Sequence, residues 1–352
     1  MSVESIENLV ISIREEFGYA RGIPPSVVEV IERNSTSLHI IVSDRSEKSL
    51  MIGPGGRIAA ELSKRLNRKV SIHGADELLM KVHRLKLTLI RIEDLISIVN
   101  QRQKEFLTIL RNLVILEMNY PRSDISDFNQ LHRDISVGVA FSGGIDSSAA
   151  LLTTTRIISS VTALTANMGP RFIDPREKAR IKDISFELGS DIEIIEDLSE
   201  RESLIQNVEA GNIHPCGTCH EITMRKLKEH ATEKELDVLV TGELLPTGRQ
   251  SIEFVKGLLI VHFPAALALT KYRTKEIGHT IKPSSNMMRF GCTFLASQHR
   301  TGWSACGPSI FRVLRELQGG VLSTGEALSL IKSILLPAIK VSKEEQESSI
   351  VE

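Results

Sequence analysis

The chain has 352 residues, of which 41% are hydrophobic and 25% are charged, so it can bury a core and is expected to form two or three domains. Its formal net charge of −1 excludes attraction of nucleic acid by overall charge, and any such contact must come from local clusters of Lys and Arg. An aromatic content of 4% argues against recognition of nucleic acid by rows of stacked bases.

The first 76 residues alternate between helix and strand patterns. Apolar residues at helical spacing predict helices over residues 3–19, 46–52 and 57–66. Runs rich in β-branched residues predict strands over residues 26–33, 37–44 and 69–74. This order places a short loop, residues 53–56, between the second and third helices.

That loop reads Gly-Pro-Gly-Gly, and loops without side-chain bulk let phosphates approach the N–H groups at a helix N-terminus. The cations that follow it are Arg57, Lys64, Arg65, Arg68 and Lys69. The order of elements around this Gly-x-x-Gly loop resembles a type II KH domain. The resemblance implies an RNA-binding site made by Gly53, Pro54, Gly55, Gly56 and Arg57. Because KH loops commonly carry a basic residue between the glycines, a plain turn beside a solvated basic helix is the alternative.

Residues 77–118 keep apolar residues at helical spacing, which predicts one or two long helices. Together with the loop residues that follow, they form a predicted helical linker over 77–125 after a KH-like domain over 1–76. The second domain is expected over residues 126–340, and the polar tail 341–352 is expected to fray.

Strand and helix patterns alternate in the second domain. Strands are predicted over 136–141, 161–168, 191–197 and 237–242, and helices over 146–160, 175–189 and 219–234. Strands separated by helices indicate an α/β fold with a doubly wound parallel sheet, which binds ligands at the carboxyl ends of its strands.

The turn after the first of these strands reads Ser-Gly-Gly-Ile-Asp-Ser, residues 142–147. Gly143 and Gly144 permit a tight backbone, while Ser142, Ser147 and the first N–H groups of the helix can donate to phosphate oxygens. Asp146 would repel a phosphate unless a cation intervened, so we expect it to hold Mg²⁺. The alternative is a turn whose polar residues only cap the helix.

This turn resembles the PP-loop of the N-type ATP pyrophosphatases, whose domain has the adenine nucleotide alpha hydrolase-like fold. The resemblance implies that the loop grips the β and γ phosphates of ATP, that a nucleophile attacks the α phosphate, and that pyrophosphate leaves. Asp146 would then act in catalysis. It also implies that adenine binds near Ala166 and Asn167 and that Gly242 lies near the phosphates, with plain backbone packing as the alternative for these positions.

Cys216 and Cys219 form a Cys-x-x-Cys pair, and Cys292 follows far downstream. In a large intracellular chain such a pair indicates a metal or redox element. The set resembles the cysteines of the tRNA 2-thiouridine and 2-thiocytidine synthetases. That resemblance implies a 4Fe-4S cluster held by Cys216, Cys219 and Cys292, with one iron open to carry sulfide. A structural zinc site and a metal-free dithiol are the alternatives.

Cys306 has three open roles: a fourth metal ligand, a persulfide-bearing nucleophile or a small buried residue. We take it as a candidate catalytic residue. Next to the Cys-x-x-Cys pair, His214 and His220 are possible ligands, and His220 could tune a cluster.

The N-terminus has no basic stretch followed by an apolar run, so no signal peptide is predicted. The most apolar window, residues 257–269, contains His262 and Pro264 and is too short to span a bilayer. We therefore expect a cytoplasmic protein without membrane contact.

Together these features predict an ATP-dependent RNA sulfurtransferase that adenylates a base carbonyl, releases pyrophosphate and replaces the oxygen by sulfur. Its expected partners are tRNA or another RNA and a sulfur donor, either sulfide or a carrier. The target base and a homodimer are left open. The alternatives are an amide synthetase with structural zinc and a non-catalytic RNA-binding protein that senses nucleotide.

Overall fold

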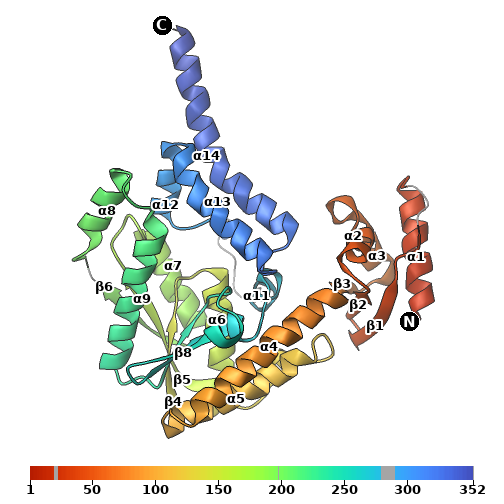
Figure 1. Cartoon of the computed structure of the whole chain (residues 1–352), viewed down its shortest axis with the longest axis horizontal. Coiled ribbons are helices and arrows are strands. Elements are labelled where there is room, and N and C mark those ends of the chain that lie inside the picture. Colours follow the sequence, from red (N-terminus) through yellow and green to blue (C-terminus); the bar gives the residue numbers. More distant parts are fainter. Residues whose placement is uncertain (20–22, 197, 279–289, 352) are drawn as a thin grey trace. The chain divides into compact units, whose positions relative to one another are not determined.

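The protein is described by a computed structural model covering residues 1–19, 23–196, 198–278 and 290–351 (Figure 1). It divides into two compact units, Met1–Leu89 with Arg111–Phe128 and Ile90–Leu110 with Asn129–Glu352. The long helices α4 (Ala75–Ile96) and α5 (Gln101–Met118) contribute residues to both units.

The first unit begins with the six elements that the sequence pattern predicts, in the predicted order. They are α1 (Val3–Glu16), β1 (Val27–Asn34), β2 (Ser37–Val42), α2 (Arg45–Ile52), α3 (Arg57–Leu66) and β3 (Lys69–Gly74). The strands form a three-stranded sheet in the order β1-β2-β3, in which β2 pairs antiparallel with β1 and parallel with β3.

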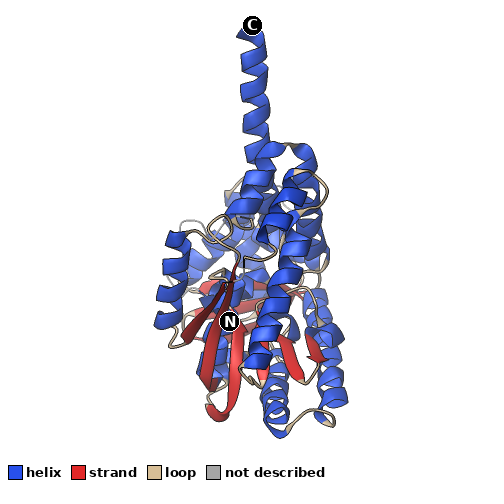
Figure 2. Ribbon diagram, turned by 90° about the vertical axis from the view of Figure 1, so that its left-hand side faces the viewer, coloured by secondary structure: helices blue, strands red, loops and turns tan. Residues whose placement is uncertain are grey.

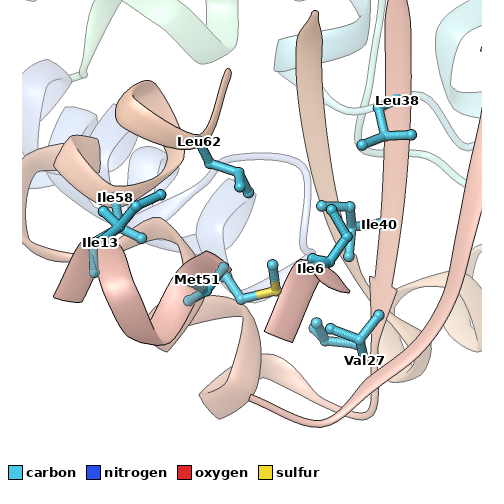
Figure 3. Close-up of a cluster of buried hydrophobic side chains, with 10 residues drawn as sticks. Ile6, Ile13, Val27, Leu38, Ile40, Met51, Ile58 and Leu62 are labelled. Carbon is cyan, nitrogen blue, oxygen red and sulfur yellow. The ribbon is translucent and has the colours of Figure 1, made fainter. Parts of the chain in front are cut away.

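The three helices cover one face of this small sheet. Ile6 and Ile13 of α1, with Ile58 and Leu62 of α3, are fully buried against β2 residues such as Ile40 (Figure 3). Their helical spacing turns one apolar stripe of each helix toward the sheet. Since α2 and α3 are both held by this core, the Gly-Pro-Gly-Gly loop between them is fixed at both ends.

The second unit contains a six-stranded sheet in the order β6-β5-β4-β7-β9-β8. The strands are β4 (His132–Ala140), β5 (Ile158–Asn167), β6 (Asp191–Glu196), β7 (Val238–Thr241), β8 (Ile252–Val255) and β9 (Leu258–His262), and both sheets are red in Figure 2. All neighbouring strands run parallel except β8 and β9, which pair antiparallel. The predicted α/β fold with a parallel sheet is confirmed.

Nine helices belong to the described part of this unit after β4. They are α6 (Ile145–Ile157), α7 (Pro175–Glu187), α8 (Arg201–Glu209), α9 (Pro215–Glu233), α10 (Phe263–Ala266), α11 (Lys271–Gly278), α12 (Thr293–Gln298), α13 (Trp303–Gln318) and α14 (Thr324–Val351). Residues 341–351, which the polar composition predicts to fray, continue α14. Among the helices within the described ranges, none is long and apolar enough to cross a membrane.

The strand order fixes where a ligand can bind. The chain passes from β4 to β5 on one side of β4 and later returns to its other side with β7. In doubly wound sheets the ligand crevice lies at the carboxyl ends of the strands where the order reverses. Here that point is the end of β4 and β7, which lead into residues 141–144 and 242–243.

Candidate active site

The glycine turn, residues 142–147, follows β4, and its two serines contact each other. Ser147 Oγ lies 3.1 Å from Ser142 Oγ, accepts from the Ser142 N–H at 3.3 Å and donates to the Gly144 carbonyl at 3.0 Å. Gly143 has a φ of 71°, a conformation that favours glycine. Gly144 is the N-cap of α6 and has no side chain with which to cap it. The first N–H groups of α6 therefore receive no side-chain cap, and their binding of a phosphate stays a prediction.

Gly242 brings the end of β7 against this turn. A Cβ atom on Gly242 would lie 2.6 Å from the Ser147 nitrogen and 2.7 Å from the Ser147 Cα. Only glycine allows so close an approach. The structure thus packs Gly242 against Ser147, and a place for Gly242 near the phosphates stays a prediction.

Helix α7 supports the turn from another side. Arg180 Nη2 donates to the Gly143 carbonyl at 3.0 Å, and the guanidinium is held by Glu177 one turn earlier. A Cβ on Gly143 would meet Arg180 Nη2 at 2.8 Å. The sequence gives no signal for this contact, because Arg180 is one of several charged residues along a helix.

Asp146 lies in the first turn of α6 and is engaged by α11. Lys271 Nζ lies 2.5 Å from Asp146 Oδ2, and Thr274 Oγ1 donates to Asp146 Oδ1 at 2.7 Å. Lys271 and Thr274 are 125 and 128 residues away from Asp146 in the sequence. Local sequence patterns therefore do not predict these contacts. Asp146 as a Mg²⁺ ligand stays a prediction.

Ala166 and Asn167 end β5, the strand beside β4. Asn167 is buried, and its side-chain oxygen accepts from the Gly169 N–H at 2.9 Å. Its side-chain nitrogen donates to Glu196 at 3.3 Å. Both residues therefore lie at the ligand-binding edge of the sheet, where adenine binding stays a prediction.

The cysteines of α9 and α12 lie in one region. Cys216 and Cys219 are in the first turns of α9, and Cys292 is the N-cap of α12. Phe294 of α12 and Ile222 of α9 belong to one buried cluster, on which Cys219 packs. Burial raises the pKa of Cys219 to about 12, and the charges of Cys292 and Cys216 act in the same direction. The structure thus brings the three thiols close enough for their charges to interact.

These three thiols form a soft donor set, which suits iron–sulfur clusters and zinc. Burial, and the charge of Cys292, also raise the pKa of Cys216 despite the opposing effect of Arg312. Over the ranges that the structure describes, no three His, Cys, Asp or Glu side chains form a group that could hold one metal ion. The three thiols therefore match the implied cluster in donor type, and Cys216, Cys219 and Cys292 as its ligands stay a prediction.

Thiol alkylation tests this environment. We expect iodoacetamide to label Cys292 of the metal-free protein much faster than Cys219 at about pH 8, because the thiolate is the nucleophile and Cys219 stays protonated until the pH nears its raised pKa. Cys292 is exposed and Cys219 is partly buried. Peptide mapping by mass spectrometry measures the two rates, with unfolded protein as the control in which they converge. Equal labelling rates of Cys292 and Cys219 in the folded protein would contradict the raised pKa and the burial of Cys219.

Cys306 lies apart from this donor set, in the core of the C-terminal helices. It is fully buried in α13, packed with Val313 and Ile334. Its Sγ lies 3.5 Å from the Ile334 carbonyl and 3.7 Å from the His299 carbonyl. Of the three roles left open for Cys306, the small buried residue is the one that this position fits.

A polar contact links the residue after Cys219 with the residue after Gly242. His220, which follows Cys219, places Nε2 3.1 Å from Glu243 Oε1, and Glu243 follows Gly242. His262 Nδ1 lies 3.3 Å from Glu243 Oε2. Burial acts to raise the pKa of Glu243, but the hydrogen bond from His220 and the neighbouring positive charges outweigh it and lower the pKa. The ionised Glu243 carboxylate therefore connects the segment after Gly242 with the first turns of α9.

His214 is also placed by the structure. It is the N-cap of α9, and its Nδ1 accepts from the Cys216 N–H at 3.4 Å. Its other nitrogen lies 3.4 Å from Ser309 Oγ. His214 and His220 are possible ligands by their sequence position beside the Cys-x-x-Cys pair. In the structure, His214 contacts Cys216 and Ser309, and His220 contacts Glu243.

The Gly-Pro-Gly-Gly loop of the first unit has a backbone that glycine favours. Gly53, Gly55 and Gly56 have φ angles of 69°, 63° and 76°, and a Cβ on Gly53 would lie 2.6 Å from the side chain of Ile58. Of the helix cations, Lys64 and Arg65 pair with Glu61, and Arg68 pairs with Glu32. The positive φ angles explain why glycine occupies positions 53, 55 and 56 of the loop. RNA binding by Gly53–Arg57 stays a prediction.

Comparisons with known proteins place few constraints on this site. No protein-family model matches the chain. An uncharacterized protein of Methanocaldococcus jannaschii is 28% identical over 203 residues, which cover 56% of this chain and 74% of the relative.

Two solved structures are similar to part of the chain. The U34-tRNA thiolase NcsA from Methanococcus maripaludis with its 4Fe-4S cluster has a TM-score of 0.38 at 15% identity, over 66% of this chain and 78% of that chain. The NH3-dependent NAD synthetase from Campylobacter jejuni has a TM-score of 0.30 at 16% identity, over 58% of this chain and 86% of that chain. Since both TM-scores lie below 0.5, the chemistry of this site rests on its own residues.

Proposed function

We propose that the chain is an ATP-dependent RNA sulfurtransferase, with tRNA as the most suitable class of substrate. The observation that carries the proposal is the placement of a complete Ser-Gly-Gly-x-Asp-Ser turn at the switch point of a parallel sheet. Beside it, Glu243, which follows Gly242, contacts His220, which follows Cys219. An ATP-activating loop and a thiol set therefore serve the same edge of the sheet.

The residues of the turn hold the nucleotide. Ser142, Ser147 and the first N–H groups of α6 donate to the β and γ phosphates, and Gly242 keeps the β7 backbone clear of them. Asp146 would bind the Mg²⁺ that accompanies ATP and neutralises the phosphates. With the β and γ phosphates held in this way, the phosphorus atom of the α phosphate is the one that the nucleophile would attack.

The reaction has two steps. The carbonyl oxygen of an RNA base attacks the α phosphate, so a P–O bond to the base forms and the bond to pyrophosphate breaks. Sulfide from the donor then attacks the activated carbon, AMP leaves with the former carbonyl oxygen, and a thiocarbonyl remains. Adenylation is required because oxygen leaves poorly on its own and well as part of AMP. Exclusion of water protects the adenylated base from hydrolysis.

The thiol region, made of Cys216, Cys219 and Cys292, is where the sulfur would be supplied in this scheme. Cys216, Cys219 and Cys292 would hold a 4Fe-4S cluster, and a cluster with one open iron would supply bound sulfide. Glu243 follows Gly242 and contacts His220, which follows Cys219, and this pair would orient the base or move a proton. The three-stranded first unit, with its Gly-Pro-Gly-Gly loop, is proposed to bind the RNA backbone.

An assay with unmodified tRNA, Mg-ATP and sulfide tests the proposal. Digestion of the RNA and mass spectrometry of its nucleosides should show a thionucleoside that needs all three substrates. Protein purified without oxygen should be brown and contain iron. Colourless protein with stoichiometric zinc and no thionucleoside would contradict the proposal and favour an amide synthetase.

A further inference from the structure

Asp146 is the acidic residue of the glycine turn and forms an ion pair with Lys271 of α11. Backbone contacts and buried neighbours hold both residues in place. The Asp146 and Lys271 side chains are 25% and 23% exposed. Lys271 is held through its backbone N–H, which donates to the Val321 carbonyl at 2.9 Å, and Thr274 is fully buried. The contact is therefore built into the packing of α11 against α6.

The glycine turn has donors for phosphate but no cation of its own. Its six residues contain N–H groups, two hydroxyls and one carboxylate, and Ile145 occupies the position before Asp146. A phosphate held by the N–H groups of α6 would lie at the same first turn of the helix that carries the Asp146 carboxylate. Repulsion between the two is strong in a partly buried site. A positive charge beside Asp146 removes this obstacle.

We propose that Lys271 is the counter-ion of Asp146 and that it makes the glycine turn able to accept the phosphates of ATP. In the protein without nucleotide, the ammonium and the carboxylate sum to zero charge, so the turn presents its N–H donors without a net negative neighbour. When Mg²⁺ enters with ATP, the metal supplies the positive charge at Asp146 in place of the lysine. Thr274 keeps the carboxylate oriented in both states through its hydrogen bond to Oδ1.

This inference rests on the proposed function, because it requires ATP to bind at the turn. Lys271 is a positioning residue in it, since it acts on the nucleotide through Asp146. A purely structural lysine would instead hold α11 in place, and its loss would not depend on the charge at Asp146 or on metal.

Equilibrium binding of radiolabelled ATP to the full chain separates these roles. Lys271→Met should weaken ATP binding in EDTA about tenfold, because an unpaired carboxylate then faces the phosphates. Adding Asp146→Asn to Lys271→Met should recover most of that affinity, since the repelling charge is gone. Mg²⁺ should reduce the loss caused by Lys271→Met, because the metal neutralises Asp146.

Lys275→Met is the matched control. Lys275 lies one turn further along α11 and pairs with Glu326 at 2.6 Å, so this variant should bind ATP as the unaltered protein does. Thermal unfolding checks that each variant is folded. The inference fails if Lys271→Met binds ATP as Lys275→Met does, or if Asp146→Asn does not relieve its defect. An unaltered protein that binds no ATP at all would overturn the proposed function itself.

Discussion

Replacing Gly242 by alanine is expected to abolish ATP cleavage. The added Cβ would lie 2.6 Å from the Ser147 nitrogen and 2.9 Å from the Asp146 carbonyl carbon, and all of these are backbone contacts that cannot rotate away. The end of β7 and the first turn of α6 must therefore separate. A displacement of this kind lowers the rate of ATP cleavage about 100-fold or more. Overpacking should also lower the free energy of unfolding by about 3 kcal/mol.

The rate of AMP release measures the first effect, and chemical denaturation measures the second. Gly325→Ala is the matched control, because a Cβ on Gly325 meets no atom within 4 Å. That variant should cleave ATP at the original rate. If Gly242→Ala retained full activity and stability, the close approach of β7 to the glycine turn would not be part of the site.

Cys219→Ala is expected to stop sulfur transfer while leaving ATP activation in place. Cys219 lies in the thiol region on α9, whereas the phosphate donors lie on the turn before α6. Loss of one of three ligands should remove most of the bound iron, and loss of thionucleoside should be about 100-fold or more. The variant should still release one equivalent of pyrophosphate in a single turnover with RNA, because adenylation uses the residues of the glycine turn and needs no sulfide.

Cys306→Ala is the control for this variant. Its thiol is fully buried among Val313, Ile334 and other apolar residues, so its removal should cost about 1 kcal/mol of stability and leave iron content and thionucleoside formation unchanged. Loss of iron or of sulfur transfer in Cys306→Ala would restore a functional role to this residue. Retention of both in Cys219→Ala would contradict the cluster assignment.

The elements of the first unit were predictable because each carries its own periodicity. Ile6, Val10 and Ile13 repeat at helical spacing in α1, and β1 alternates between more and less buried residues. Strand β9 was not predicted, because all five of its residues are buried and it therefore shows no alternation. Its apolar run continues into α10, and the sequence offers no signal that separates strand from helix there.

The glycine turn was predictable because all of its residues are contiguous. Its partners were not, since Lys271, Thr274 and Arg180 reach it from other helices and only the fold brings them there. Glu243 follows β7, His262 is the last residue of β9, and the two meet because β7 and β9 are parallel neighbours. Likewise, the sequence cannot distinguish a ligand from a buried cysteine at position 306, because its burial depends on packing against α14.

The glycine turn is proposed to direct bond cleavage to the α phosphate of ATP during thiolation of RNA. Incubation of the protein with tRNA, sulfide and ATP labelled in its α phosphate tests this role. We expect labelled AMP and unlabelled pyrophosphate, with AMP formed in an amount equal to the thionucleoside. Release of labelled ADP and inorganic phosphate would contradict it.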